Sequence, residues 1–291
     1  MKIGIITDSY RLPMPESLRL AASAGADGVQ CYATSALLSL DPSGLARDAS
    51  SMGLEISALV AELGGHGFER AADNPRKLGQ MEAVFDFAAA AGAGVVTGHI
   101  GVIPADPSHP RHGVMRDALD AVGRQAASRN LVFAVETGPE PPETLASMLA
   151  QTSSGVAVNY DPANLLMVHN TDPVHAVEVL HPWIAYTHAK DGVHYRDCDA
   201  QRVYDAFASG GFEQLQRETG DLFEEKPLGE GDVGFPRCLK ALRRHGYGGY
   251  LTIERETGDN PVEEIAQAVK YLRALLEDAA SLHQDPVVAI R

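Results

Sequence analysis

The sequence predicts an α/β fold, a single (β/α)8 TIM barrel with a long loop insertion after strand 7. Three observations predict this fold. Short apolar runs alternate with longer segments of helical period, there are eight such runs, and no shift in composition divides the 291 residues. Because α/β barrels commonly use about 250 residues as one domain, we expect residues 1–280 to form the barrel and residues 281–291 a C-terminal tail.

The eight apolar runs have the character of parallel strands that are buried on both faces. Eight such strands are the number that closes a barrel, with a helix after each strand. In chain order, the predicted strands cover residues 2–7, 27–31, 54–61, 94–100, 131–136, 156–160, 184–189 and 249–254.

Three of the intervening helices show a clear apolar stripe. One begins after Asn74 and Pro75 and ends near Gly92, another ends at Gly246, and the last begins at Asn260, with Pro261 at the first helical position and Glu263 completing a start that resembles a capping box. Their apolar faces consist of Leu78, Met81, Phe85 and Ala88 in the first, Phe235, Leu239 and Leu242 in the second, and Val262, Ile265, Val269, Leu272 and Leu276 in the third.

The main irregularity is the connection between strand seven and the helix before strand eight. Residues 191–231 occupy a position where barrels usually have a much shorter loop. Loops that follow barrel strands lie on the catalytic face, so this insertion is a candidate lid. The alternative is an excursion without a role in the site, with a short helix near residues 200–207. The sequence leaves both interpretations open.

The composition is that of a folded protein with a sizeable core, because 45% of the residues are hydrophobic and 22% are charged. We expect neither disorder nor a membrane span. A net charge of −15 repels polyanions, and no cluster of Lys and Arg stands out, so nucleic acid is not an expected partner. The chain begins without an export signal, and Cys31, Cys198 and Cys238 form no CxxC pair. We therefore expect a cytoplasmic protein without disulfides or a thiolate zinc site.

Four residues that could hold a metal fall at the ends of successive predicted strands. They are Glu136, Asp161, His188 and Glu254. The carboxyl ends of parallel barrel strands converge on one rim, so these side chains can share a pocket. Three clustered carboxylates repel one another unless a cation lies between them, and three oxygens with one imidazole suit Mn²⁺, Co²⁺, Mg²⁺ or Zn²⁺. Any one of them alone could be a helix cap, a salt bridge or a core histidine, but the four together predict one divalent metal ion.

Five segments in order carry a resemblance to a known family. VFAVETG, NYDPANLL, YTHAKD, PLGEGDVGF and GYLTIERE resemble the successive signatures of the sugar phosphate isomerase/epimerase superfamily, the xylose isomerase-like TIM barrels. That superfamily includes ketose 3-epimerases, hydroxypyruvate isomerase, inosose dehydratases and isomerases, and endonuclease IV. The motifs are specific for the superfamily and weak for the substrate.

The resemblance implies that Glu136, Asp161, His188 and Glu254 are the metal ligands and that Glu136 and Glu254 also move protons. It implies a sugar isomerase or epimerase acting on a small ketose, a polyol-derived ketone or a hydroxy-keto acid through a metal-stabilised enediolate. The alternative that keeps the same pocket is a dehydratase or lyase of inosose or keto-acid type. A phosphodiesterase like endonuclease IV and a non-enzymatic sugar-binding barrel are further alternatives.

Four neighbouring residues are expected to contact the substrate: His66, His99, Asn164 and Lys190. Asn164 departs from the family pattern, because many members have histidine there, and asparagine is better suited to a substrate hydroxyl than to a metal. His66 and His99 could instead be structural or hold a second metal, and Lys190 could form a salt bridge across the rim. No dinucleotide fingerprint or GxSxG turn occurs, so we expect no nucleotide cofactor. A homodimer is the expected assembly.

Overall fold

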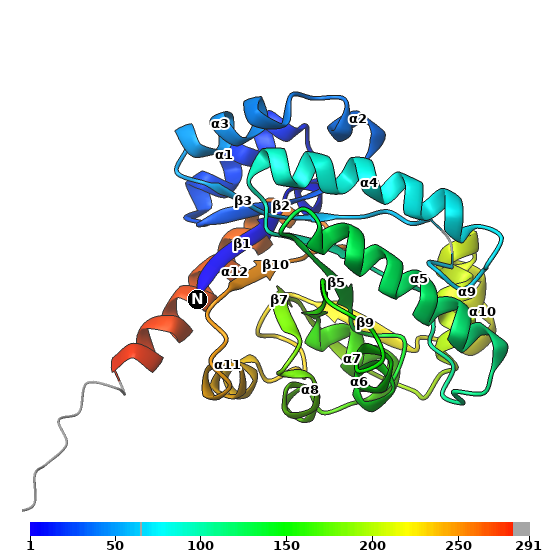
Figure 1. Cartoon of the computed structure of the whole chain (residues 1–291). Helices are drawn as coiled ribbons and strands as arrows, with labels where there is room; N and C mark the ends of the chain where they lie inside the picture. The colour runs from blue at the N-terminus through cyan, green and yellow to red at the C-terminus, as the bar shows by residue number, and fades with distance from the viewer. Residues whose placement is uncertain (65, 282–291) are drawn as a thin grey trace, which may run out of the picture.

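The computed structural model describes residues 1–64 and 66–281, and eight parallel strands in it close into a barrel (Figure 1). The order around the barrel is β1-β10-β7-β6-β5-β4-β3-β2, so β10 joins β7 to β1. The predicted TIM barrel is therefore confirmed, and each predicted strand overlaps one observed strand. These strands are β1 (Lys2–Ile6), β2 (Gly28–Tyr32), β3 (Glu55–Val60), β4 (Val95–Gly98), β5 (Val132–Glu136), β6 (Val156–Tyr160), β7 (Ile184–Ala189) and β10 (Tyr250–Ile253).

Helices surround the barrel, and most of them begin with proline in the first turn, where its missing N–H costs no hydrogen bond (Figure 1). They are η1 (Thr7–Tyr10), α1 (Met14–Ala24), α2 (Ser35–Leu38), α3 (Pro42–Ser51), α4 (Asn74–Ala91), α5 (Pro110–Ala127), α6 (Pro142–Leu149), α7 (Pro162–His169), α8 (Pro173–Leu180), α11 (Phe235–Arg244) and α12 (Pro261–Ser281).

The three predicted apolar stripes face the core with one exception. Met81, Phe85 and Ala88 of α4 are buried, as are the predicted residues of α11. Val262, which we predicted on the apolar face of α12, is 37% exposed. It lies in the first turn of that helix, before the helix packs against the barrel at Ile265.

Polar side chains fill part of the barrel interior below the strand ends. Tyr186 lies on β7 two residues before His188, and its hydroxyl bonds both Ser57 and Thr252 at 2.6 Å. Gly4 leaves room for this layer, because a Cβ atom there would lie 2.5 Å from the Thr252 hydroxyl. This layer of hydrogen-bonded side chains therefore lies beneath the residues at the carboxyl ends of the strands.

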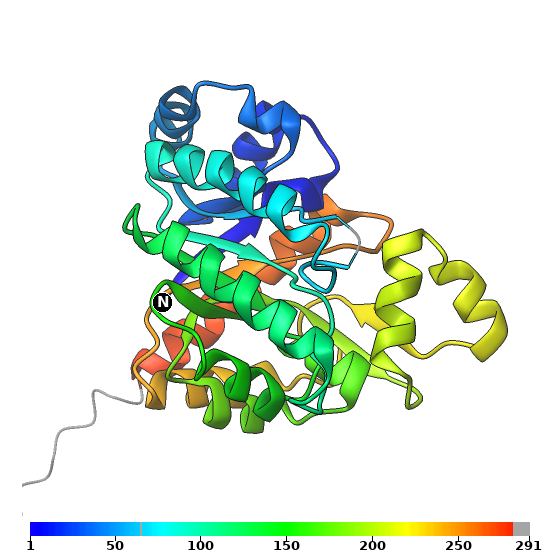
Figure 2. The same cartoon turned by 45° about the vertical axis from the view of Figure 1, so that its right-hand side comes forward.

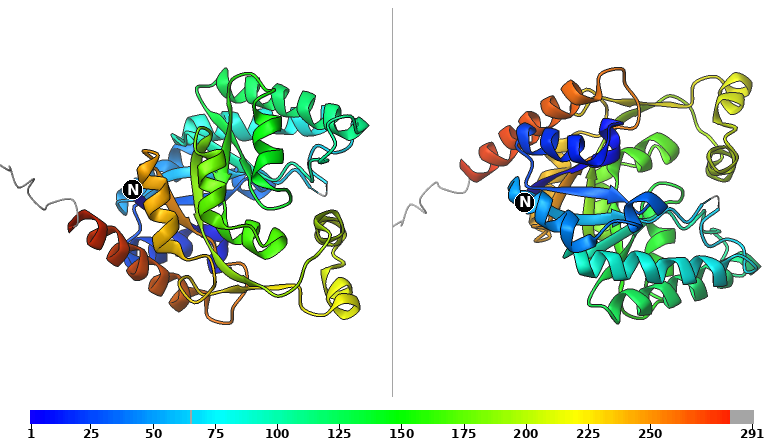
Figure 3. Two further views of the ribbon diagram at one scale, coloured as in Figure 1. Left: turned by 90° about the horizontal axis from the view of Figure 1, so that it is seen from below. Right: turned by 90° about the horizontal axis from the view of Figure 1, so that it is seen from above.

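The insertion, residues 191–231, is more ordered than a loop. It contains an antiparallel pair of strands, β8 (Asp191–His194) and β9 (Phe223–Lys226), and two helices, α9 (Ala200–Ser209) and α10 (Phe212–Thr219). The expected short helix near residues 200–207 lies within α9, whereas β8, β9 and α10 were not predicted. The two helices lie to one side of the barrel (Figure 2), as both views in Figure 3 also show.

The predicted tail, residues 281–291, lies outside the described residues except for Ser281, the last residue of α12. Among the helices that the structure describes, none has the length and apolar character needed to cross a membrane.

Candidate metal centre

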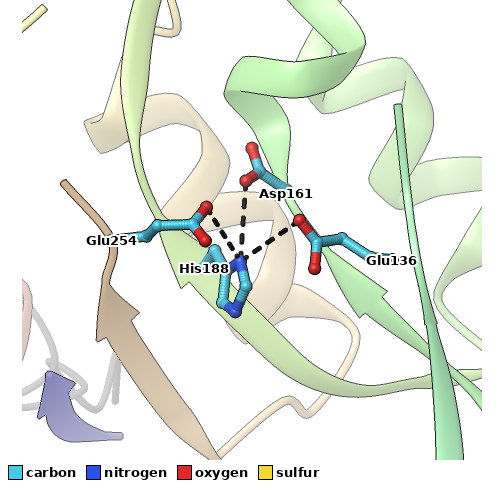
Figure 4. A group of neighbouring side chains, drawn as sticks. All are labelled: Glu136, Asp161, His188 and Glu254. Atoms are coloured by element: carbon cyan, nitrogen blue, oxygen red, sulfur yellow. Dashed lines mark ion pairs between the residues drawn. The ribbon is translucent and has the colours of Figure 1, made fainter. Parts of the chain in front are cut away.

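The structure brings four side chains together at the carboxyl ends of the strands (Figure 4). Glu136 ends β5, Asp161 follows β6, His188 lies on β7, and Glu254 follows β10. Each offers one ligand atom, and these atoms all lie within 4.8 Å of one another. All four residues are buried, with at most 6% of their surface exposed.

One imidazole nitrogen lies at the centre of the group. His188 Nδ1 is 3.3 Å from Glu254 Oε2 and 3.6 Å from both Glu136 Oε1 and Asp161 Oδ2 (Figure 4). Asp161 Oδ2 is buried and has no hydrogen-bond partner among the described residues. A buried carboxylate oxygen without a partner is costly, and a divalent cation would satisfy it. The donor set of three oxygens and one nitrogen fits such a cation.

Residues of two other strands orient the imidazole. His188 Nε2 lies 3.0 Å from Gln30 Oε1, and the Gln30 amide donates to Thr97 Oγ1 at 2.9 Å. With its amide committed to Thr97, Gln30 presents its oxygen to Nε2, so Nδ1 is the ring nitrogen that faces the carboxylates. Neither Gln30 nor Thr97 was predicted from the sequence, although each is a polar residue inside an apolar strand.

The carboxylates and the histidines of the centre stabilise each other's charged forms. Burial by itself lowers the pKa of His188, but the carboxylates of Glu254 and Glu136 outweigh it and raise that pKa well above its usual value. Burial raises the pKa of Glu136, and the neighbouring His99 and His188 outweigh it, so the pKa falls well below its usual value. Glu136 is thus ionised at neutral pH, which a metal-ligand role requires.

Asn164 and His99 both contact the same carboxylate. The Asn164 amide donates to Glu136 Oε1 at 3.1 Å, and His99 Nε2 lies 3.3 Å from that oxygen. The His99 side chain is 43% exposed, so it can reach a bound molecule. Burial lowers the pKa of His99, but the neighbouring carboxylates, Glu136 above all, together outweigh burial and raise that pKa to about 9.

The other two expected contact residues are engaged elsewhere. Lys190 donates to Glu254 Oε2 at 3.0 Å and also to Glu256. These two contacts form the salt bridge across the rim that was the alternative role for Lys190. His66 follows β3 and lies 3.2 Å from Asp205 on α9 of the insertion, measured from Nδ1 to Oδ1. His66 therefore lies where the barrel rim meets the insertion, outside the four-residue centre.

Two further residues near the centre were missed. Tyr204 on α9 places the edge of its ring against His99, with 5.7 Å between ring centroids and 71° between planes. Glu140, four residues after Glu136, is buried, and burial raises its pKa to about 8. Tyr204 gave no sequence signal because its position depends on how the insertion folds, and Glu140 looked like an ordinary loop carboxylate.

The fold and the site together define a class of protein: a TIM barrel with a buried carboxylate and histidine centre at the catalytic face. The family is shown by a family model for the xylose isomerase-like TIM barrel, which matches residues 18–275. The chain belongs to that family.

The individual proteins that this chain resembles share little of its sequence. The L-ribulose-5-phosphate 3-epimerase UlaE of Salmonella typhimurium is 40% identical over 60 residues, which is 20% of this chain and about a fifth (21%) of the relative. A probable 3-DHS dehydratase, AsbF of Bacillus anthracis, superposes with a TM-score of 0.74 at 18% identity, covering 94% of this chain and 99% of that one. The D-psicose 3-epimerase of Clostridium cellulolyticum H10 gives a TM-score of 0.71 at 13% identity, covering 95% and 99%. At such identities the two structures show a shared fold.

Proposed function

We propose that this protein is a metal-dependent isomerase or epimerase of a small ketose, a polyol-derived ketone or a hydroxy-keto acid. The observation that carries the proposal is the meeting of Glu136, Asp161, His188 and Glu254 around one point. These four would hold one divalent ion, Mn²⁺, Co²⁺, Mg²⁺ or Zn²⁺. When bound there, such an ion polarises a carbonyl and an adjacent hydroxyl and so makes the intervening C–H more acidic.

We infer that the two glutamates move the proton. Glu136 and Glu254 lie on opposite sides of His188, on strands separated by β6 and β7 (Figure 4). One carboxylate removes the proton from the carbon beside the carbonyl, and the other returns a proton to the opposite face or the neighbouring carbon. Asn164 and His99 hold Glu136, and Lys190 holds Glu254, so each carboxylate keeps a fixed direction.

The remaining expected residues have supporting roles in this proposal. His99, Asn164, His66 and Lys190 would contact substrate oxygens, because they line the rim around the centre or the neighbouring insertion. A homodimer, a cytoplasmic location and the assignment of residues 1–280 to a single domain stay predictions.

A dehydratase that acts in the same site is the second candidate. It is supported by the similarity in fold to the probable 3-DHS dehydratase and by the raised pKa of His99, about 9, which keeps that imidazole protonated. A protonated His99 could pass its proton to a departing hydroxyl. The two reactions differ in one measurable respect, because dehydration lowers the mass of the product by one water and epimerisation does not.

The test is exchange of substrate hydrogen with heavy water. Protein loaded with Mn²⁺ is incubated with a panel of ketoses, and deuterium at carbon is measured by mass spectrometry and NMR. We expect one deuteron per turnover without loss of mass. Glu254→Gln should lower the rate by roughly 10² to 10⁴, the usual contribution of a positioned acid or base.

The matched control is Glu230→Gln, which removes an exposed carboxylate from the insertion. It should exchange as the wild type does. A product lighter by one water would replace the epimerase with the dehydratase. Absence of metal from the purified protein, with ligand binding unchanged in Glu136→Gln, would favour a non-enzymatic barrel.

A further inference from the structure

Helix α9 of the insertion brings a tyrosine to the rim of the metal centre. The Tyr204 ring contacts His99 edge-on, and its hydroxyl lies beside Gly138, which also lies beside Asn164. A Cβ atom built on Gly138 would be 2.9 Å from that hydroxyl and 2.8 Å from Asn164 Cβ. Since Asn164 donates to Glu136, the phenol is one side chain away from a residue of the centre.

The position of α9 is fixed from two sides. Toward the barrel, Asp205 pairs with His66, and the Gln201 amide approaches the Glu69 carboxylate at 3.5 Å. Toward the insertion, Tyr204 packs against a small apolar cluster of its own, which consists of Val203, Leu215 and Leu222. The placement of Tyr204 at the rim is therefore built into the fold of the insertion.

The Tyr204 hydroxyl is available as a hydrogen-bond donor. It has no hydrogen-bond partner in the part of the chain that the structure describes, whereas the hydroxyls of Tyr160 and Tyr186 each have one. Burial, followed by the negative charges of Glu140 and Glu136, raises the pKa of Tyr204 well above its usual value. The phenol therefore keeps its proton at neutral pH and can donate it to an oxygen of a bound molecule.

Three cations near this rim, Lys190, Arg111 and Arg255, are paired with carboxylates. Lys190 pairs with Glu254 and Glu256. Arg111 pairs with Glu69 at 3.0 Å, beside Gln201 of α9, and Arg255 pairs with Glu225 and Glu264 at the base of the insertion. A phosphate or carboxylate group would need a cation to offset its charge, and binding one here would require breaking a buried or half-buried ion pair. A hydroxyl group needs only a donor or an acceptor.

We propose that Tyr204 is a specificity-determining residue that donates a hydrogen bond to a hydroxyl of the substrate at the rim of the metal centre. The insertion thereby selects an uncharged polyhydroxy ketone over its phosphate ester. This inference rests on the proposed function and names the substrate class of the same site.

The test compares Tyr204→Phe with Tyr195→Phe, a matched loss of an exposed phenol on the same insertion. Both variants and the wild type are loaded with Mn²⁺, and KM and kcat are measured for free ketoses and for their phosphate esters. Loss of one hydrogen bond should raise KM for the free ketose roughly fivefold to tenfold in Tyr204→Phe. We expect kcat to change less than twofold, Tyr195→Phe to match the wild type, and the wild type to prefer the free ketose. Equal melting temperatures verify that the folds are intact.

A KM that changes less than twofold in Tyr204→Phe, or a wild-type preference for the phosphate ester, would overturn this inference while leaving the isomerase proposal standing. Binding gives a readout that needs no turnover. Xylitol, an uncharged polyol, is titrated into the Mn²⁺-loaded proteins by calorimetry, with inorganic phosphate as competitor. Weaker xylitol binding in Tyr204→Phe, with no competition by phosphate, supports the inference even if no sugar exchanges deuterium. Equal binding in both proteins, or displacement by phosphate, contradicts it.

Discussion

Asp161 shows how one residue can have a structural and a chemical role together. Its Oδ1 accepts a hydrogen bond from the backbone N–H of Asn164 at 2.9 Å and caps α7, while Oδ2 points toward His188. Thr137 fixes the Asp161 backbone through two further bonds, at 2.8 and 2.9 Å. The sequence offered a cap and a metal ligand as alternatives for this residue. The geometry is compatible with both, because a carboxylate has two oxygens.

Glu140 gives a prediction about stability and pH. Burial raises its pKa to about 8 in the folded protein, against about 4.3 in an unfolded chain. The folded state therefore binds more protons between these values, so its stability falls as the pH rises from about 5 to 8. Glu140→Gln removes this loss and should stabilise the protein by roughly 1 to 3 kcal/mol at pH 8. The measurement is urea unfolding of both proteins at pH 5.5 and pH 8.

The control for this comparison is Glu82→Gln, which changes an exposed carboxylate on α4. Its difference from the wild type should be the same at both pH values. A Glu140→Gln protein whose stability depends on pH as steeply as the wild type would show that Glu140 does not titrate as the structure indicates.

At the scale of elements, the insertion depends on one carboxylate at its base. Asp191 accepts hydrogen bonds from the backbone N–H groups of Gly192 and Gly229 at 2.9 Å and of Val233 at 3.1 Å. These bonds join the start of β8 to the loop that leads into α11. From the sequence, Asp191 could be placed only at the beginning of a long loop, because its three partners are decided by how that loop folds back.

Removing this carboxylate should loosen the insertion while the barrel stays folded. Asp191→Ala leaves three backbone N–H groups without an acceptor, at a cost of roughly 2 to 4 kcal/mol. We expect faster amide hydrogen exchange in β8 and β9, with exchange in β1 to β7 unchanged. Asp197→Ala, which removes an exposed carboxylate of the insertion, should exchange as the wild type does. Uniform protection across the chain in Asp191→Ala would contradict this role.

For the whole molecule, an ion held at the candidate centre would link metal binding to folding. Three carboxylates gathered inside a chain of net charge −15 repel one another, and a cation that binds only the folded state offsets that repulsion. The four side chains of the candidate centre lie on or directly after β5, β6, β7 and β10, so an ion bound there would tie half of the barrel strands together.

We therefore expect the melting temperature to rise when Mn²⁺ is added. At a free concentration of about 100 times its Kd, the ion should add about 2.7 kcal/mol to the free energy of unfolding. The gain should grow as the pH rises, because a metal ligand must be a neutral imidazole and the pKa of His188 is raised well above its usual value. Differential scanning calorimetry at pH 6 and pH 8 measures this. Glu136→Gln should lose most of the gain and Glu230→Gln should keep it, and an equal gain in both variants would place the ion elsewhere.

The sequence by itself determined the barrel and the four side chains of its candidate centre. Buried parallel strands must be apolar throughout, so polar residues such as Glu136 and Glu254 stand out where those runs end, and barrel closure requires these ends to meet. Only the tertiary structure decided the contacts made across the molecule. Gln30 reaches His188 across the interior, and Tyr204 reaches the rim because the insertion folds around its own small core. Such contacts depend on the distances between segments far apart in the chain, and periodicity along the sequence carries no information about those distances.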